Sequence, residues 1–211
     1  MITFTGRIEA LCIGQEGTLG KEAVAALMFV TDGIEADRHA GFTRDTWDKG
    51  DKQPPGIIRR NERQWSAVSS EELEQISQDM RLTERLTAAD VGANLEISGV
   101  PHFSCLTKGS LLALEDGGTL VVEEYNPPCQ EMGERLAARY ARADGKPLKA
   151  GDFLRAAKRS RGVVGVVDVA GDARVGDPVT ITLYAPPEAM RHPALVERIA
   201  SQRKKNRKVS A

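Results

Sequence analysis

The chain has 211 residues, of which 41% are hydrophobic and 28% are charged, and its formal net charge is −1. This composition is typical of a globular protein, and the length suits one domain with extensions. The balanced charge and an aromatic content of only 5% argue against nucleic acid as a partner. No apolar run approaches the roughly 20 residues of a membrane helix, and the N-terminus lacks the pattern of a signal peptide. We therefore expect a cytoplasmic protein with no membrane partner.

Short β-like segments, punctuated by glycine and aspartate, predominate along the chain. Alternating or β-branched apolar residues predict strands at residues 4–13, 25–30, 64–68, 94–97, 110–114, 119–124, 162–169 and 179–183. The segment 115–118, Glu-Asp-Gly-Gly, predicts a hairpin between two of them, and Gly171-Asp172 predicts a turn. Many short strands with a few interleaved helices favour a mainly β or α+β fold over a doubly wound sheet.

Three helices are expected. One begins after Ser69, which forms a capping-box pattern with Glu72. Residues 131–140 contain apolar side chains at one-turn spacing, and residues 149–159 predict another short helix.

Residues 38–63 form a long polar segment that is rich in turn residues and has no clear periodicity. A loop of this length inside a compact domain is usually functional or mobile. We place a single domain at residues 1–185 and a C-terminal extension at 186–211. The extension ends in a strongly basic stretch, 203–208, which we expect to be disordered.

Cys129 is the most informative single residue, because it follows two prolines and directly precedes an expected helix. There, unpaired backbone N–H groups and the positive end of the helix dipole favour the thiolate. The thiolate is the form that attacks, carries sulfur or binds a metal. Nearby glutamates oppose a thiolate if they lie close, and a buried inert role is the alternative, since free cysteine is often a packing residue.

Several common site motifs are absent from the sequence. The cysteines Cys12, Cys105 and Cys129 are widely spaced, which argues against a disulfide framework or a structural zinc site. There is no glycine-rich dinucleotide or nucleotide-triphosphate motif, no serine nucleophile elbow and no HExxH.

Five segments, in order, resemble the MOSC domain family, the molybdenum-cofactor sulfurase C-terminal domain family. Residues 33–41 (Gly-Ile-Glu-Ala-Asp-Arg-His-Ala-Gly) are similar to its G-[IL]-E-G-D-R-H-A-G signature, with Ala36 where glycine is commoner. The other resembling segments are 63–73, 91–100, 127–129 and 161–179. The resemblance covers roughly residues 1–185. Nothing resembles the pyridoxal-phosphate domain of the eukaryotic sulfurases, so neither a pyridoxal phosphate site nor desulfurase chemistry is expected in this stand-alone, bacterial-type member.

The resemblance implies a strongly bent, closed β-barrel with a few peripheral helices. It also implies that Cys129 either ligates molybdenum in the pterin cofactor or carries sulfur as a persulfide. Some stand-alone relatives reduce N-hydroxylated compounds with that cofactor.

The pterin cofactor bears a phosphate, and arginine is the residue best suited to bind phosphate. We expect Arg38, Arg59, Arg60 and Arg63 to supply these donors. His39 is expected to orient the ligand or move a proton, or else to bind a loop carbonyl. Asn94 is expected to contact the cofactor, or else to cap a turn.

The leading hypothesis is a molybdenum-cofactor-binding protein that reduces N-hydroxylated or related small substrates, with Cys129 as metal ligand and catalytic residue beside His39. The first alternative is a sulfur carrier that holds a Cys129 persulfide for delivery to the molybdenum cofactor or another metal–sulfur centre, with a sulfur donor or acceptor protein as partner. The second is a non-catalytic barrel that binds a partner through its basic tail. An enzyme, either a reductase or a sulfur transferase, is favoured, and the oligomeric state stays open.

Overall fold

A computed structural model describes residues 2–47 and 51–187 of the chain. The basic stretch 203–208, and with it the hypothesis of partner binding through the tail, lies outside the described residues. No helix in the described part of the chain is long and apolar enough to cross a membrane.

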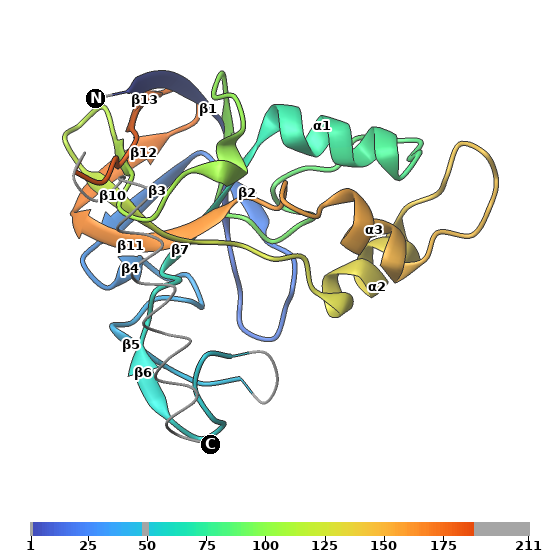
Figure 1. Cartoon of the computed structure of the whole chain (residues 1–211), viewed down its shortest axis with the longest axis horizontal. Helices are drawn as coiled ribbons and strands as arrows, with labels where there is room; N and C mark the ends of the chain where they lie inside the picture. The colour runs from blue at the N-terminus through green and yellow to red at the C-terminus, as the bar shows by residue number, and fades with distance from the viewer. Residues whose placement is uncertain (1, 48–50, 188–211) are drawn as a thin grey trace, which may run out of the picture.

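Seven of the described strands close a β-barrel, which confirms the expected fold class (Figure 1). β1 and β13 pair and close the sheet. All neighbouring pairs are antiparallel except β7 and β8, which run parallel. In order round the barrel the strands are β1 (Thr3–Ile13), β13 (Pro178–Thr182), β9 (Leu111–Ala113), β10 (Thr119–Tyr125), β11 (Val163–Val169), β7 (Trp65–Ser69) and β8 (Leu95–Ser98).

The long strand β1 provides much of the closure. Its first half pairs with β13 and its second half with β8, and the register shifts between Ile8 and Ala10. Such a bulge bends a strand and increases its twist, which a small closed barrel requires. β2 (Glu22–Val24) continues the sheet beside the end of β1. The barrel interior is filled by apolar side chains, among them Ile8, Leu11, Phe29, Trp65, Leu95, Phe103, Leu120 and Val163.

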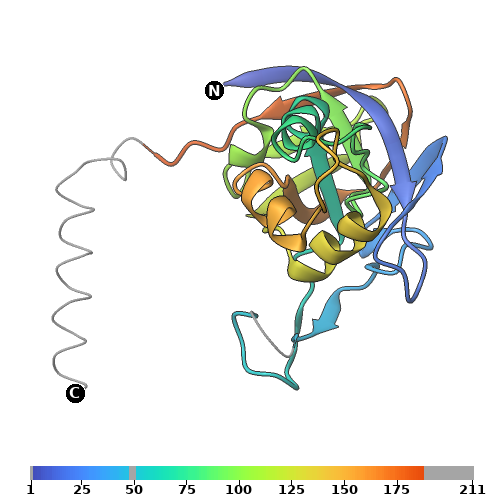
Figure 2. The same ribbon diagram turned by 90° about the vertical axis from the view of Figure 1, so that its right-hand side faces the viewer.

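Three helices lie together at one side of the barrel: α1 (Ser70–Asp79), α2 (Gln130–Arg139) and α3 (Ala150–Ala156) (Figures 1 and 2). They enclose a second apolar cluster that includes Leu73, Ile76, Met80, Leu86, Val91, Met132, Leu136 and Phe153. Ser69 caps α1 as expected, since its Oγ accepts a hydrogen bond from Glu72 N at 3.3 Å. The Glu72 carboxylate instead binds Ser104 in the short 3₁₀ helix η1 (Phe103–Cys105).

Two small sheets complete the fold. β3 (Ala26–Val30) lies between β4 (Gly33–Ile34) and β12 (Gly171–Arg174). β5 (Thr43–Asp45) and β6 (Ile58–Arg60) form a two-stranded ribbon that projects from the barrel (Figures 1 and 2). We call this ribbon, residues 42–61 without 48–50, the arm.

The structure differs from expectation at three places. The segment 38–63 contains the arm, whose strands of three residues are too short to show a clear alternation. Gly171 and Asp172 form part of β12 rather than a turn, because they pair with the sequence-distant β3. Helix α3 ends at Ala156, before the predicted end at residue 159.

Helices α2 and α3 pack closely at Gly133. A Cβ atom at this position would lie 2.6 Å from the carbonyl oxygen of Ala150, a distance at which one backbone must move. Gly133 is therefore required for the packing that holds the helix following Cys129 against α3.

We expect Gly133→Ala to destabilise the protein by about 1–3 kcal/mol, because overpacking outweighs the roughly 1 kcal/mol that alanine gains in helix propensity. Gly151→Ala in α3 is the matched control, since its Cβ would meet only the side chain of Arg155 at 3.5 Å. The measurement is urea unfolding of both variants beside the wild type. Equal stability of the two variants would contradict the close packing of α2 and α3.

Candidate functional site

Cys129 lies between β10 and α2, at the N-cap position of the helix, and its side chain is exposed. Its carbonyl accepts the first helical hydrogen bond, from Gly133 N at 3.2 Å, whereas its thiol makes no capping hydrogen bond. The backbone N–H groups of the first turn have no partner within the helix and lie at the positive end of its dipole. Cys129 therefore occupies the helix N-terminal position that the sequence predicted.

Two arginines lie close enough to Cys129 to interact with it electrostatically. Arg63 Nη2 donates a hydrogen bond of 2.6 Å to Asn126 Oδ1, three residues before the cysteine. The backbone of Asn126 in turn donates to the carbonyl of Gly162 at 2.9 Å, which places the neighbouring Arg161 at the same junction. The end of β10, the start of β11 and the segment before β7 thus meet around the thiol.

Arg161 is only 7% exposed, although it carries a charge. Its Nη2 donates to the carbonyl of Val91, whereas its buried Nη1 has no hydrogen-bonding partner among residues 2–47 and 51–187. Burial lowers the pKa of Arg161 to about 10, and negative charge on Cys129 opposes this effect. An unpaired buried donor on a guanidinium is costly, so Arg161 retains one strong donor that the described residues do not use.

Sequence reasoning missed Arg161 as a site residue. The available signal was its place at the start of a segment that resembles the MOSC family, directly before Gly162, whose φ is +90°. The same reasoning included Arg63, whose role stays a prediction.

Arg63 is held by the arm as well as by Asn126. Its guanidinium carbon lies 5.2 Å from the ring centroid of Trp47, and that of Arg44 lies 4.2 Å from the same ring. Burial lowers the pKa of Arg63, and the carboxylate of Glu62 opposes this most strongly. Cation–π contacts of this kind restrict the orientation of a guanidinium, so the arm positions one of the two arginines at Cys129.

The structure gives the other three expected arginines different partners. Arg59 is paired with Asp51 and with Glu62, Arg60 is paired with Glu123, and Arg38 donates to the carbonyl of Thr18. Arg59 and Arg60 are thus neutralised by carboxylates, which a phosphate would have to displace. The phosphate site made of these four arginines stays a prediction, and the structure adds Arg161 as a further candidate near Arg63.

A second polar cluster surrounds the buried carboxylate of Asp37. Its Oδ2 accepts hydrogen bonds from Gly14 N at 2.7 Å, Lys21 Nζ at 2.7 Å and Asn94 Nδ2 at 2.8 Å. Its Oδ1 lies 3.0 Å from both the backbone N and the ring Nδ1 of His39. The side chains of Asp37 and Lys21 are completely buried.

These contacts affect the protonation of Asp37 and His39. Burial alone would raise the pKa of Asp37, but the hydrogen bonds from His39 and the charge of Lys21 outweigh it and hold that pKa well below its usual range. Burial lowers the pKa of His39 despite the hydrogen bond to Asp37. A neutral His39 with its proton on Nδ1 donates to the carboxylate and keeps Nε2 as an acceptor. A neutral His39 is able to accept a proton at Nε2, and its predicted role in moving a proton stays a prediction.

Asn94 is used within the protein, contrary to its expected role as a cofactor contact. Its Nδ2 donates to Cys12 O and Asp37 Oδ2, and its Oδ1 accepts from the N and Oγ of Ser66. An amide makes at most four such bonds, and Asn94 is 1% exposed. It joins β1 to the segment before β8 and to β7.

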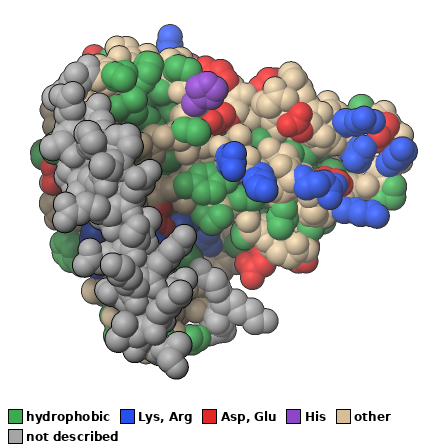
Figure 3. Space-filling view, viewed as in Figure 1, with side chains coloured by type: hydrophobic (Ala, Val, Ile, Leu, Met, Phe, Trp, Pro, Cys, Tyr) green, Lys and Arg blue, Asp and Glu red, His purple; other side chains and the backbone are tan. Residues whose placement is uncertain are grey.

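The surface around α3 is basic. Figure 3 shows Lys and Arg side chains in a row over α3 and the segment that precedes it. Exposed basic residues in this region are Lys146, Lys149, Arg155, Lys158 and Arg159. Such a row creates a local positive potential that attracts anions, even though the net charge of the chain is near zero.

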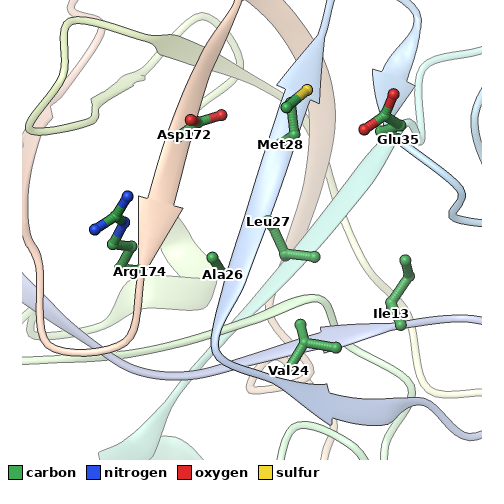
Figure 4. Close-up of a pocket in the computed structure, with 8 residues that line it drawn as sticks. All are labelled: Ile13, Val24, Ala26, Leu27, Met28, Glu35, Asp172 and Arg174. Atoms are coloured by element: carbon green, nitrogen blue, oxygen red, sulfur yellow. The ribbon is translucent and has the colours of Figure 1, made fainter.

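A shallow pocket lies elsewhere, over β2, β3 and β12 (Figure 4). Apolar side chains, including Val24 and Leu27, line its middle, with Asp172 and Arg174 on one side and Glu35 on the other. None of the predicted site residues is among its eight lining residues.

Replacing Asp37 by Asn should destabilise the protein by about 3–5 kcal/mol near neutral pH, because Lys21 then stays buried without its counter-charge. The pKa of Asp37 is lower in the folded than in the unfolded protein. Its contribution is therefore complete above about pH 5 and declines as the pH falls below about 4. The stability difference between wild type and variant should shrink between pH 5 and pH 2. Urea unfolding across this range, with the exposed Asp79→Asn as control, is the measurement; a constant difference would contradict the assigned charge.

The chain is similar in sequence and in structure to known proteins. The family model of the MOSC domain matches residues 29–180. A Bacillus subtilis (strain 168) protein named "Putative metal-sulfur cluster biosynthesis proteins YuaD" is 31% identical over 180 residues, which are 85% of this chain and 92% of that protein. The crystal structure of YuaD from Bacillus subtilis superimposes with a TM-score of 0.81 at 29% identity, over 87% of this chain and 99% of that one. YiiM from Geobacillus stearothermophilus shares the fold, with a TM-score of 0.59 at 15% identity over 93% and 91% of the two chains. The chain therefore belongs to the MOSC domain family.

Proposed function

We propose that this protein is a sulfur carrier, which holds sulfur as a persulfide on Cys129 and delivers it for the assembly of a metal–sulfur centre. The observation that carries the proposal is an exposed thiol at a helix N-terminus with Arg63 and Arg161 beside it. A carrier thiol must be reachable by both donor and acceptor, and its anionic forms must be stabilised.

The chemistry follows from this placement. The Cys129 thiolate attacks the terminal sulfur of a donor persulfide, the donor's S–S bond breaks, and the donor thiolate leaves with the electron pair. The new Cys129 persulfide is an anion, which the N-terminus of α2 and the two guanidiniums stabilise. When an acceptor attacks the terminal sulfur, the same charges stabilise Cys129 as the leaving thiolate.

The name of the Bacillus subtilis relative, which refers to metal–sulfur cluster biosynthesis, supports the same class of function for this chain. Donor and acceptor proteins are natural partners, because Cys129 is exposed at the chain surface. The nearby basic row over α3 suits a partner with an acidic surface.

A molybdenum-cofactor protein is the second candidate, and the open Nη1 of Arg161 favours it. The donor set fits such a group, since a thiolate is a soft ligand for the metal and a guanidinium suits the cofactor phosphate. Cys129 would hold the metal, and Arg63 and Arg161 would bind the phosphate. The bound cofactor would supply redox chemistry for the reduction of N-hydroxylated substrates, and His39 is the proposed group for moving a proton.

Cys129→Ser should abolish sulfur loading, because serine cannot form a persulfide. Reduced protein is incubated without air with polysulfide or a donor persulfide, and intact-mass spectrometry detects the added sulfur. Cys105→Ser is the matched control, since Cys105 is the other exposed cysteine in the described residues. Wild type and control should each gain sulfur at Cys129; sulfur that still loads on Cys129→Ser as on wild type would rule out this carrier site.

The molybdenum content of protein purified without air from a cofactor-competent host tests the second candidate. Stoichiometric molybdenum in the wild type that disappears in Cys129→Ala would support it. Metal-free wild type that loads sulfur on Cys129 would favour the carrier.

A further inference from the structure

Several hydrogen-bond donors near Cys129 are not hydrogen-bonded to its thiol and could bind a further anion. Helix α2 has ten residues, and the N–H groups of Gln130, Glu131 and Met132 belong to its uncapped first turn. Arg161 adds a buried Nη1 that has no partner among the described residues. Arg63 adds a second guanidinium, held through Asn126. The exposed carboxylate of Glu131, in the first turn, is the opposing charge.

The burial of Arg161 decides what size of anion this site can bind. With 7% of its surface exposed, its guanidinium is inaccessible to the surface of a partner protein, so an anion that pairs with the unpaired Nη1 has to be small. Two guanidiniums and a helix N-terminus together suit a dianion with several oxygen acceptors.

We propose that Arg161, Arg63 and the first turn of α2 bind the oxyanion end of thiosulfate, so that its outer sulfur meets the Cys129 thiol. This inference rests on the proposed sulfur-carrier function and names a small-molecule sulfur donor for it. The row of basic residues over α3 raises the local concentration of such an anion.

The reaction balances without another reactant. The Cys129 thiolate attacks the outer sulfur of thiosulfate, and a new S–S bond forms on the cysteine. The S–S bond of thiosulfate breaks, and sulfite leaves with the electron pair. Arg161 and Arg63 stabilise the negative charge that develops on the leaving sulfite. The products are a Cys129 persulfide anion and a sulfite dianion.

A phosphate monoester shares this recognition chemistry, since it is also an oxygen-rich dianion. The two sources differ in outcome, because only thiosulfate releases sulfite and transfers sulfur. Binding and transfer therefore have to be measured separately.

The experiment uses the reduced full-length protein, without air, with thiosulfate as the only sulfur source. Sulfite release and the mass of the Cys129 persulfide are followed together. Arg161→Gln should slow sulfite release by roughly tenfold or more, as expected for the loss of a charged hydrogen bond. The rate of Arg161→Lys should lie between that of Arg161→Gln and that of the wild type. Arg7→Gln is the matched control, since it removes the same charge from an exposed position on β1, outside the basic row over α3, and should react as the wild type does.

Two further measurements keep the test independent of the folding of Arg161 variants. Arg63→Gln, in the half-buried second guanidinium, should also slow the reaction, and sulfate should compete with thiosulfate in the wild type. Calorimetric titration of Cys129→Ser with thiosulfate and with inorganic phosphate measures binding where transfer is impossible.

The outcomes separate the two proposals. If polysulfide loads Cys129 but thiosulfate releases no sulfite, the thiosulfate inference is overturned and the carrier function stands. If phosphate binds Cys129→Ser and thiosulfate does not, the site serves a phosphate and the inference is equally overturned. If no donor of any kind loads Cys129, the carrier function itself fails.

Discussion

The buried carboxylate of Asp37 is the constraint on which the polar interior of this barrel depends. A charge with no exposed surface is tolerated only when it is paired and hydrogen-bonded, and Asp37 meets this condition with partners from three segments of the chain. It binds Gly14 after β1, Lys21 before β2, His39 after β4, and Asn94 before β8. These contacts hold the loops at this part of the barrel in a single arrangement. The cluster therefore accounts for the spacing of Asp37 and His39 in the segment 33–41: the aspartate is held by the neighbouring histidine as well as by distant donors.

The Cys129 site also contains buried charge, but here the buried groups are cations rather than an anion. In the barrel, β10 pairs with β11, and β11 pairs with β7. This order brings the chain after β10, which carries Cys129, next to the chain before β11, which carries Arg161. Arg63 reaches the junction from the segment before β7 and is held there by Trp47 of the arm and by Asn126. A reactive anion at Cys129 thus receives support from three parts of the sequence, and the arm affects the site through one side chain.

Local patterns were reliable where a residue's neighbours in sequence are also its neighbours in space. The cap at Ser69, the hairpin after β9 and the start of α2 at Cys129 all follow from a few adjacent residues, and the structure confirms them. The pattern failed where pairing is long-range. β12 pairs with β3 across most of the chain, so Gly171 and Asp172 read as a turn when taken alone. The partners of Arg59 and Arg60 could not be predicted for the same reason, because sequence spacing does not show which carboxylates pair with them in the fold.

By itself, the sequence determined the family, the barrel class and the position of Cys129 at a helix N-terminus, since these depend on local propensity and on motifs read in order. Only the tertiary structure decided which cations face the thiol. A guanidinium in a polar loop can serve a ligand, a carboxylate or a carbonyl, and its partner is set by burial and by distance across the fold. Arg161 is separated from Cys129 by two helices in sequence, and closure of the barrel brings it to the thiol and buries it with one donor unpaired.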